Sequence, residues 1–477
     1  PEKIHDFVME LASPVLTFFL DLLHNQAVLV LATSRIATKS AESGGWVCSS
    51  LCGLPRGSTR GCRLPGEQPD ANTRHFFVGT SNTGYMVYRF SGRMGRVPES
   101  FLDELFRVSA VPGVISFAGG LPGSAYIDVE GLRDAARAVF SEDGRTALQY
   151  TTTDGYLPLR EFIADRYRRR LGLPATPEEI QIVNGSQQCL DLVAKIFLDP
   201  GDAVGMERPG YLGAIEAFSL YEPVFHAVPL VEDGPDLDAF AALVRKYAPK
   251  FFYGIPNSQN PSGRTYSEEK RRGVAEILEG TDTVFYEDDA FGELFFDGKP
   301  RPPVKRFLPD QGIMSGSFSK IVAPGMRIGW IYAPEPILRE FNVAKQAADL
   351  HSNFLCQVIL HRYLATHDLD AHVARVSAVY GRQCRLMCDL LDDLMPPGVT
   401  HTTPEGGMFL TAALPDGVSS MEVFREGVRE GVAVLPGVPF YVNGGGEDTI
   451  RLNFSAVGEE AIEEGMHRLA RVVRRLA

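Results

Sequence analysis

The sequence predicts an α/β fold whose centre is a mostly parallel sheet. From Met86 onward, short runs of β-branched and aromatic residues alternate with longer helical patterns, the order typical of parallel strands joined by crossover helices. Polar residues stand where such runs end, at the edge where α/β sheets bind ligands. With 477 residues, 44% of them hydrophobic, the chain is long enough for a large core and two or three domains.

Individual elements follow from the same patterns. We expect strands at residues 180–185 (IQIVNG), 251–256 (FFYGIP), 283–289 (TVFYEDD) and 449–455 (TIRLNFS), and helices at residues 100–110 (SFLDELFRVSA) and 159–173 (LREFIADRYRRRLGL). Residues 40–85 are rich in Gly, Ser, Pro and Arg and lack a lasting periodicity, which predicts a loop or linker.

Net charge and cysteine content limit the class of protein. A formal net charge of −13 argues against a broad nucleic-acid footprint and suits an enzyme of small metabolites. The seven cysteines are an odd number spread thinly through the chain, so a disulfide framework is not expected. We therefore predict a cytoplasmic protein with reduced thiols and without nucleic-acid partners.

The N-terminal stretch FVMELASPVLTFFLDLLHNQAVLVLA is apolar but is not expected to span a membrane. Glu10, Asp21 and His24 interrupt it, and no window reaches the roughly 18 uninterrupted apolar residues that a transmembrane helix requires. It also lacks the basic start and the cleavage site of a signal peptide. We predict no targeting segment, and we expect the chemistry to lie after Met86.

Residues 315–330 read SGSFSKIVAPGMRIGW and place Lys320 in an unusually specific setting. A lysine takes part in chemistry when its uncharged amine attacks a carbonyl and forms a Schiff base. The commonest cofactor that uses such a lysine is pyridoxal phosphate, whose ring acts as an electron sink. A site of this kind needs phosphate donors, an acid for the pyridine nitrogen, a donor to the ring oxygen, an aromatic ring over the cofactor and a cation for the substrate carboxylate.

Two groups of residues are candidates for binding the phosphate. They are Ser317, Ser319 and Arg327 around the lysine, and Gly185, Ser186 and Gln187 at a turn from a strand into a helix. An arginine can bind a phosphate through two parallel hydrogen bonds, and the amides and dipole of a helix start favour an anion. Taken alone, the turn is more typical of an ordinary helix N-cap.

Polar residues near the ends of two other strands meet the needs of the cofactor ring. Asp288 ends an apolar run, where a carboxylate would keep the pyridine nitrogen protonated. Asn260 supplies an amide donor within PNSQNPSG. Considered singly, an acid at a strand end is more often a solvated turn residue, and NP and SG pairs are usually turns.

Two further residues complete the set. Tyr211 follows the strand-like run DAVGME and can stack on the ring, although a core tyrosine has the same pattern. Arg451 lies inside a short apolar strand near the C-terminus, and its guanidinium matches the planar α-carboxylate of an amino acid. No single residue is decisive, but together they meet every need of such a site.

Taken in order, the motifs of this chain resemble the fold-type I pyridoxal-phosphate aminotransferases (class I/II), and most of all their 2-aminoadipate and kynurenine aminotransferase branch. The resemblance runs from about residue 90 to the end of the chain and rests on ISFAGGLP (115–122), LQYTTTDGYLPLREFIA (148–164), NGSQQCLDLVA (184–194), PNSQNPSG (256–263), EDDAFGEL (287–294), SGSFSKIVAPGMRIGW (315–330), KQAADLHSNFLCQ (345–357), PEGGMFL (404–410), LPGVPFY (435–441) and RLNFS (451–455). It implies a large domain with a mostly parallel seven-stranded sheet and a smaller α+β domain.

The resemblance also implies domain limits. Residues 1–85 would be an extension of unknown role, 86–140 an N-terminal arm and part of the small domain, 141–345 the large cofactor-binding domain, and 346–477 the C-terminal small domain. The reaction it implies moves the α-amino group of an amino acid to a 2-oxo acid. The acceptor would be 2-oxoglutarate or pyruvate by analogy with the family.

Each candidate residue receives a role from the resemblance. Lys320 would form the Schiff base and then carry the proton between substrate and cofactor. The cofactor would be bound by Gly185, Ser186, Gln187, Tyr211, Asn260, Asp288, Ser317, Ser319 and Arg327, with Tyr150 reaching the phosphate of the neighbouring subunit in a homodimer. The substrate would be bound by Arg451, Gly120, Asn260 and Asp103.

Two positions depart from the family pattern. Phe291 stands where the family has a tyrosine whose hydroxyl donates to the ring oxygen, so Asn260 would hold that oxygen alone. Asp103 stands where branch members that accept acidic side chains have an arginine, and an acid there would favour a donor with a cationic side chain. The alternative for Asp103 is a solvated helix face.

Other functions were weighed against this one. The same cofactor serves decarboxylation, racemisation and side-chain elimination. Aminotransferase-like domains also occur in transcriptional regulators, but residues 1–85 contain no basic recognition helix. Cys48, Cys52 and Cys62 fit no compact zinc spacing, so no metal is expected, and no P-loop or strand-anchored GxGxxG supports nucleotide binding.

Overall fold

The computed structural model describes residues 77–79, 85–95, 97 and 111–477. The chain divides into two compact units, Pro1–Pro69 and Asp70–Ala477, and every described residue belongs to the second. The predicted helix at 100–110 with Asp103, the N-terminal apolar stretch and three of the cysteines lie outside the described residues. Within the described ranges no helix is long and apolar enough to cross a membrane.

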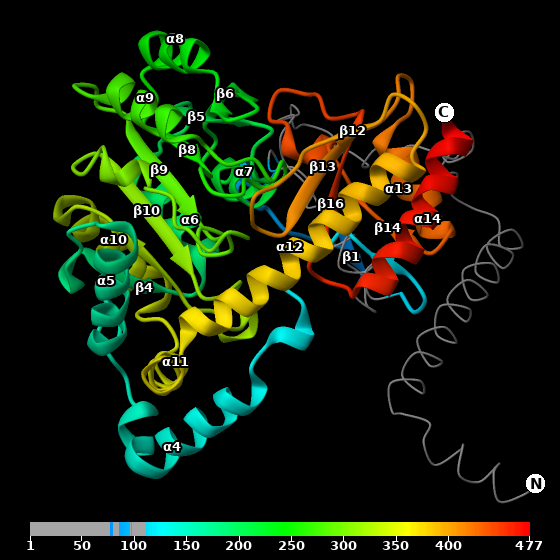
Figure 1. The fold of residues 1–477 in the computed structure, drawn as a ribbon. Helices are drawn as coiled ribbons and strands as arrows, with labels where there is room; N and C mark the ends of the chain where they lie inside the picture. The colour runs from blue at the N-terminus through cyan, green and yellow to red at the C-terminus, as the bar shows by residue number, and fades with distance from the viewer. Residues whose placement is uncertain (1–76, 80–84, 96, 98–110) are drawn as a thin grey trace, which may run out of the picture. The chain divides into compact units, whose positions relative to one another are not determined.

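The large sheet contains eight strands in the order β4-β11-β10-β9-β8-β5-β6-β7 (Figure 1). Their bounds are β4 Ile180–Val183, β5 Ala203–Arg208, β6 Val224–Val231, β7 Gly234–Pro235, β8 Phe251–Gly254, β9 Val284–Asp289, β10 Gly312–Ser317 and β11 Gly329–Tyr332. All run parallel except β11, which lies antiparallel between β4 and β10, and β7, which pairs with the end of β6. The mostly parallel α/β fold is confirmed, with one short strand more than the seven predicted.

Eleven helices are found among the described residues. They are α4 Val129–Ala147, α5 Leu157–Leu171, α6 Ser186–Phe197, α7 Leu212–Ser219, α8 Leu237–Tyr247, α9 Glu268–Leu278, α10 Glu335–Asp349, α11 Phe354–Thr366, α12 Leu369–Leu394, α13 Ser420–Arg429 and α14 Glu459–Leu476. The helix predicted from LREFIADRYRRRLGL is α5, which ends where Gly172 adopts a left-handed conformation (φ 64°). The predicted strands at 180–185, 251–256 and 283–289 are β4, β8 and β9.

Helices cover both faces of the large sheet (Figure 1). Successive residues of β8 point to opposite faces, as the period of a strand requires: Phe251 and Tyr253 pack with α6, α7 and α10, whereas Phe252 packs with α8 and α9. All four residues of β8 are buried. A strand covered on both faces loses its polar alternation, which is why FFYG is apolar throughout.

A second, antiparallel sheet has the order β12-β13-β16-β15 and packs with α12 and α14. Its strands are β12 Thr400–His401, β13 Phe409–Ala413, β16 Thr449–Asn453 and β15 Leu435–Pro436. β3 (Ile115–Ser116) pairs with β14 (Val432–Ala433). A segment that precedes the large sheet in the sequence therefore pairs with a segment that follows it. The remaining pair is β1 (Phe77–Gly79) with β2 (Tyr85–Val87).

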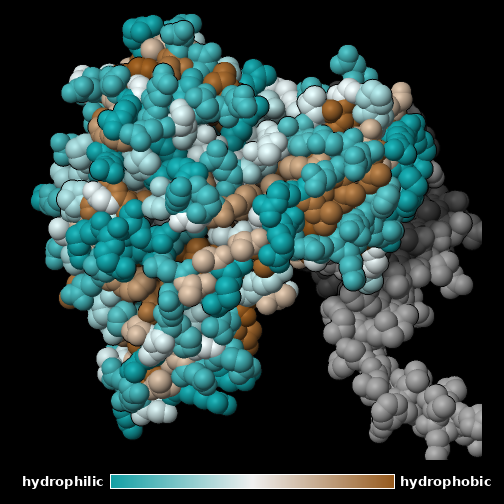
Figure 2. Space-filling view, in the orientation of Figure 1, coloured by the Kyte–Doolittle hydropathy of each residue, from teal (hydrophilic) through white to brown (hydrophobic). Residues whose placement is uncertain are grey.

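The 26-residue helix α12 extends from beside the large sheet to the smaller one (Figure 1). The side chain of Asp368 accepts a hydrogen bond from the Ala371 amide and caps its start. Cys384 and Cys388 are free and buried on this helix, as core packing predicts. On the face drawn in Figure 2, hydrophilic side chains cover most of the surface, with a strip of hydrophobic side chains toward the right of the view.

Candidate active site

A cavity of about 300 Å³ lies where the parallel strands of the large sheet end. One wall is formed at the carboxyl ends of β4, β5, β8, β9 and β10 and by the segments that follow them, with Ser186, Gln187, Tyr211, Leu212, Ile255, Asn260, Asp288, Ala290, Phe291, Ser317, Ser319, Lys320, Pro324 and Arg327. The other wall contains Gly120, Leu121, Phe409 of β13 and Arg451 of β16. This edge of an α/β sheet is where ligands bind, because every parallel strand delivers its following loop there.

All but three of the predicted site residues line this cavity. Gly185 lies directly beside it, at the start of α6. Tyr150 does not line it: its side chain is 77% exposed and its ring contacts that of His351 edge to face. Asp103 lies outside the described residues.

Lys320 lies in a water-poor environment, and none of the carboxylates that the structure describes forms an ion pair with it. Its Nζ donates to the backbone oxygen of Gly120 at 2.7 Å. Burial, together with the positive charges of Arg451 and Arg327, lowers the pKa of Lys320 to about 8. An amine with such a pKa is uncharged often enough at neutral pH to attack a carbonyl.

Asp288 is a buried carboxylate held by two hydroxyl donors. One oxygen accepts from Tyr253 at 2.8 Å and the other from Ser315 at 3.1 Å. Burial raises the pKa of Asp288, while these two hydrogen bonds act in the opposite direction. A cationic ring nitrogen at the cavity would favour the ionised carboxylate.

The start of α6 and the segment after β10 form a cradle that fits a phosphate. Gly185 has φ 76°, and a Cβ there would collide with the guanidinium of Arg327. Arg327 donates to Ser319 Oγ at 3.4 Å, and Ser317 Oγ bonds Ser319 Oγ at 2.9 Å. Free amides at the helix start, two hydroxyls and one guanidinium converge here, which is the donor set that a phosphate requires.

Gln187 and Tyr211 mark the boundary between this cradle and α7. The side-chain amide of Gln187 donates to the backbone oxygen of Gly213 at 2.9 Å, so its side chain ties α6 to α7. Tyr211 precedes α7, and burial raises its pKa to about 12, with a further contribution from Asp288. Its phenol therefore stays neutral and presents an aromatic surface to the cavity.

Arg451 is a buried guanidinium that lacks a carboxylate partner among the described residues. It donates to Asn260 Oδ1 at 2.9 Å and to the Ala118 backbone oxygen at 2.6 Å, while its Nε has no hydrogen-bond partner. Burial lowers the pKa of Arg451 to about 9. Its guanidinium carbon lies 4.2 Å from the centre of the Phe409 ring. A buried cation with an unused donor fits an anionic ligand such as a carboxylate.

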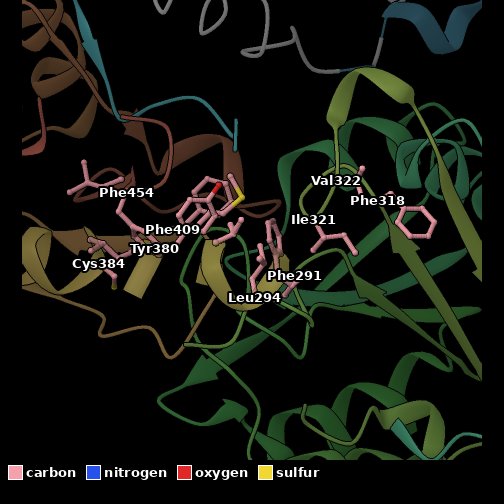
Figure 3. Close-up of a cluster of buried hydrophobic side chains, with 14 of the residues drawn as sticks. Phe291, Leu294, Phe318, Ile321, Val322, Tyr380, Cys384, Phe409 and Phe454 are labelled. Atoms are coloured by element: carbon pink, nitrogen blue, oxygen red, sulfur yellow. The ribbon is translucent and has the colours of Figure 1, made fainter. Parts of the chain in front are cut away.

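Phe291 places an apolar ring at the position where the family pattern has a tyrosine. Its ring packs edge to face against Phe409 at 5.7 Å between centroids, and both are labelled in Figure 3. The side chain is 5% exposed and lines the cavity. The hydroxyl that the family pattern supplies at this position is therefore replaced by a hydrocarbon contact.

Sequence reasoning missed two residues that hold Asp288, Tyr253 and Ser315. Ser315 lies directly beside Asp288 in the register of β10 with β9. Tyr253 lies beside Tyr286, two residues before Asp288. Each was visible as a polar atom on an otherwise apolar strand, but the register between strands decides which acid it meets.

The fold and this site define a pyridoxal-phosphate enzyme of fold type I: a buried lysine, a buried acid and a phosphate cradle meet at the strand ends. The family model described as aminotransferase class I and II matches residues 121–469. The chain belongs to the aminotransferase class I and II family. It is a pyridoxal-phosphate-dependent transaminase that transfers an amino group between an amino acid and a 2-oxo acid.

Relatives of known name agree with this assignment. The chain is 40% identical over 391 residues to the 2-aminoadipate transaminase of Thermus thermophilus, covering 81% of this chain and 97% of the relative. It is 38% identical over 392 residues to aromatic-amino-acid aminotransferase 1 of Thermococcus litoralis, covering 81% and 94%.

Solved structures agree as well. The α-aminoadipate aminotransferase of T. thermophilus, complexed with N-(5′-phosphopyridoxyl)-L-leucine, has a TM-score of 0.76 at 40% identity, covering 81% of this chain and 97% of that one. The Pyrococcus horikoshii kynurenine aminotransferase has a TM-score of 0.77 at 36% identity, covering 81% and 97%.

Proposed function

We propose that Lys320 carries the amino-transfer chemistry, with Asp288, Asn260 and Tyr211 around the cofactor ring and Arg451 on the substrate carboxylate. The observation that carries this proposal is a lysine that lines the cavity together with Asp288 and Arg451 and whose amine donates to a backbone carbonyl rather than to a carboxylate. An amine in such a place is more stable uncharged, because an unpaired charge away from water is costly. Its amine is therefore available to the cofactor.

Each residue has one task in this proposal. When bound, pyridoxal phosphate supplies an electron-poor ring that takes up the electrons released when the substrate loses its α-proton. Lys320 Nζ would hold the cofactor covalently, and once the substrate amine has displaced it, the free lysine amine would carry the substrate α-proton to the C4′ atom of the cofactor. Asp288 keeps the pyridine nitrogen protonated, and Arg451 fixes the α-carboxylate so that the Cα–H bond faces the lysine.

The phosphate cradle anchors the cofactor while Lys320 changes partners. Gly185, Ser186, Ser317 and Arg327 supply amides, hydroxyls and a guanidinium for the phosphate oxygens, whereas Gln187 contributes by fixing the start of α6 against α7. Charge-assisted hydrogen bonds of this kind are about twice as strong as neutral ones.

A spectral screen of amino acids against the purified holoenzyme tests this proposal. A productive donor converts the yellow aldehyde form of the cofactor to its amine form and releases the matching 2-oxo acid. Release of carbon dioxide, or racemised amino acid without a 2-oxo acid, would assign the chain a different reaction of the same cofactor.

The donor side chain meets an apolar wall in the described part of the cavity. Leu121, Leu212, Ile255 and Phe409 line it, and Asp288 is the one carboxylate among the described lining residues. We propose a donor with an uncharged apolar or aromatic side chain, and one relative is named an aromatic-amino-acid aminotransferase. A comparison of kcat/KM separates this proposal from a cationic donor bound by Asp103. The donors are tyrosine, leucine, 2-aminoadipate, ornithine and lysine, each measured with the wild type and with Asp103→Ala. A preference for ornithine or lysine that Asp103→Ala removes would favour the cationic donor.

Replacing Phe291 by tyrosine is expected to lower the pKa of the bound cofactor chromophore by about half a unit. An added hydroxyl donor stabilises the negative ring oxygen, which favours loss of the proton that this oxygen shares with the Lys320 nitrogen. The measurement is a pH titration of the visible absorbance of both holoenzymes. Phe291→Leu, which adds no donor, serves as the control, and an equal shift in both variants would contradict this account.

We propose that the enzyme is a homodimer in which Tyr150 completes the site of the partner. Tyr150, Leu148 and Phe140 are exposed in the single chain, at 77%, 66% and 53%. Mixing Lys320→Ala with Tyr150→Phe subunits is expected to restore activity above that of either variant, because one of the two sites in a mixed dimer is then intact. No gain on mixing, in a sample shown to exchange subunits, would contradict a shared site.

We also propose a cytoplasmic location, which the free thiols of the described cysteines support.

A further inference from the structure

Glu207, the penultimate residue of β5, is a buried acid that the proposed chemistry does not use. Glu207 is 1% exposed, and its carboxylate accepts three hydrogen bonds. They come from the Ile255 amide at 2.9 Å, the Tyr266 hydroxyl, and Gln259 Nε2 at 3.0 Å. Burial raises the pKa of Glu207 to about 7, and the three hydrogen bonds counteract this rise. Its donors all belong to one loop, residues 255–266.

Gln259 relays this contact to the turn that carries Asn260. Its Nε2 donates both to Glu207 and to the Pro209 backbone oxygen at 2.8 Å. Its Oε1 accepts from the amide and the hydroxyl of Ser262, at 2.8 and 2.6 Å. Because both ends of the amide are engaged, the Gln259 side chain has one orientation. Along the chain, Asn260 lies between Gln259 and Ser262, the two residues that these hydrogen bonds hold.

The orientation of Asn260 is equally defined. Arg451 has only donors, so the oxygen of the Asn260 amide must face it, as their 2.9 Å contact shows. The amide nitrogen is then the group left for the cavity that Asn260 lines. With Phe291 in place of a hydroxyl, the position of this one amide determines how well the cofactor's ring oxygen is held.

We infer that Glu207 is a positioning residue, which sets the Asn260 amide against the ring oxygen of the cofactor through Gln259. This inference rests on the proposed roles of Lys320 and Asn260. A carboxylate is required, because all three groups that face Glu207 donate. In Glu207→Gln the new NH₂ must face a donor in either orientation, and Gln259 cannot turn over without presenting its own NH₂ to the Ser262 amide.

A double-mutant cycle read by cofactor absorbance tests the inference. The pKa of the bound chromophore is measured by pH titration in the wild type, Glu207→Gln, Asn260→Ala and the double variant. Both single variants are expected to raise it, Glu207→Gln by about half a unit, and the double variant is expected to match Asn260→Ala. The other titratable and charged groups near these residues, Tyr266, Asp288, Arg451, Arg327 and Lys320, are unchanged throughout the cycle.

The outcomes separate this inference from the proposed function. An additive shift in the double variant, or no shift in Glu207→Gln, would overturn the positioning role while leaving the enzyme's reaction intact. A wild-type protein without a Lys320-linked chromophore would instead overturn the proposed function. If Glu207→Gln does not fold, Tyr266→Phe replaces it in the double-mutant cycle. This variant removes one donor to Glu207 and keeps the acid, so it is expected to raise the chromophore pKa by a smaller amount.

Discussion

Replacing Lys320 by alanine is expected to lower kcat/KM for transamination by at least about 10⁴-fold. In the proposed mechanism the variant loses both the covalent link to the cofactor and the base that removes the substrate α-proton, and no other amine lines the described part of the cavity. Cofactor affinity should fall less, because the phosphate cradle and Asp288 remain. The measurement combines steady-state rates with borohydride reduction and peptide mass spectrometry, which should place a pyridoxyl group on Lys320 of the wild type.

Lys305→Met provides a matched control for this result. Lys305 is also a buried lysine, and its Nζ donates to the Pro309 backbone oxygen, but it does not line the cavity. The control is expected to change thermal stability and to retain the pyridoxyl label at Lys320. A label on another lysine of the wild type, or turnover by Lys320→Ala without added amine, would exclude the assignment.

Much of the site was predictable because an α/β sheet gathers its ligand-binding residues by a simple rule. Asp288, Asn260, Tyr211 and the turn at Gly185 each follow a separate apolar run, and the carboxyl ends of parallel strands meet at one edge. The sequence therefore predicts their proximity without any knowledge of strand order. Arg451 follows a different rule: it comes from the smaller sheet, and it was predicted because a guanidinium inside a short apolar strand suits the α-carboxylate of an amino acid, a role that the family resemblance also implies.

Other features could not be read from the sequence, because they depend on contacts between distant segments. Ser315 and Tyr253 meet Asp288 only through the register of three strands. Glu207 reaches the loop of Asn260 about fifty residues further along the chain, and a lone acid two residues before a proline carries no signal of such a contact. Tyr150 is exposed in the single chain, so its proposed role would depend on a partner subunit. Packing and register decide the other positions.

Replacing Arg451 by glutamine is expected to lower kcat/KM for amino acids by about 10² to 10³-fold, the effect typical of losing a buried charged hydrogen bond. The loss should appear mainly in KM for both the amino acid and the 2-oxo acid, since each carries the carboxylate that we propose Arg451 binds. The chromophore pKa should rise, because the positive charge that lowers the pKa of Lys320 is removed. Kinetics and the absorbance titration measure the two effects separately.

The decarboxylated analogue of a good donor shows whether Arg451 acts on the carboxylate or on the fold. Wild-type enzyme should prefer the amino acid to the corresponding amine by a large factor, and Arg451→Gln should reduce this preference toward one. A purely structural role would lower both rates together and leave their ratio unchanged. Arg451 also donates a hydrogen bond to the Asn260 oxygen. In an Arg451→Gln background, Glu207→Gln should therefore change the chromophore pKa less than it does in the wild type. This result would connect substrate binding to the loop of residues 255–266.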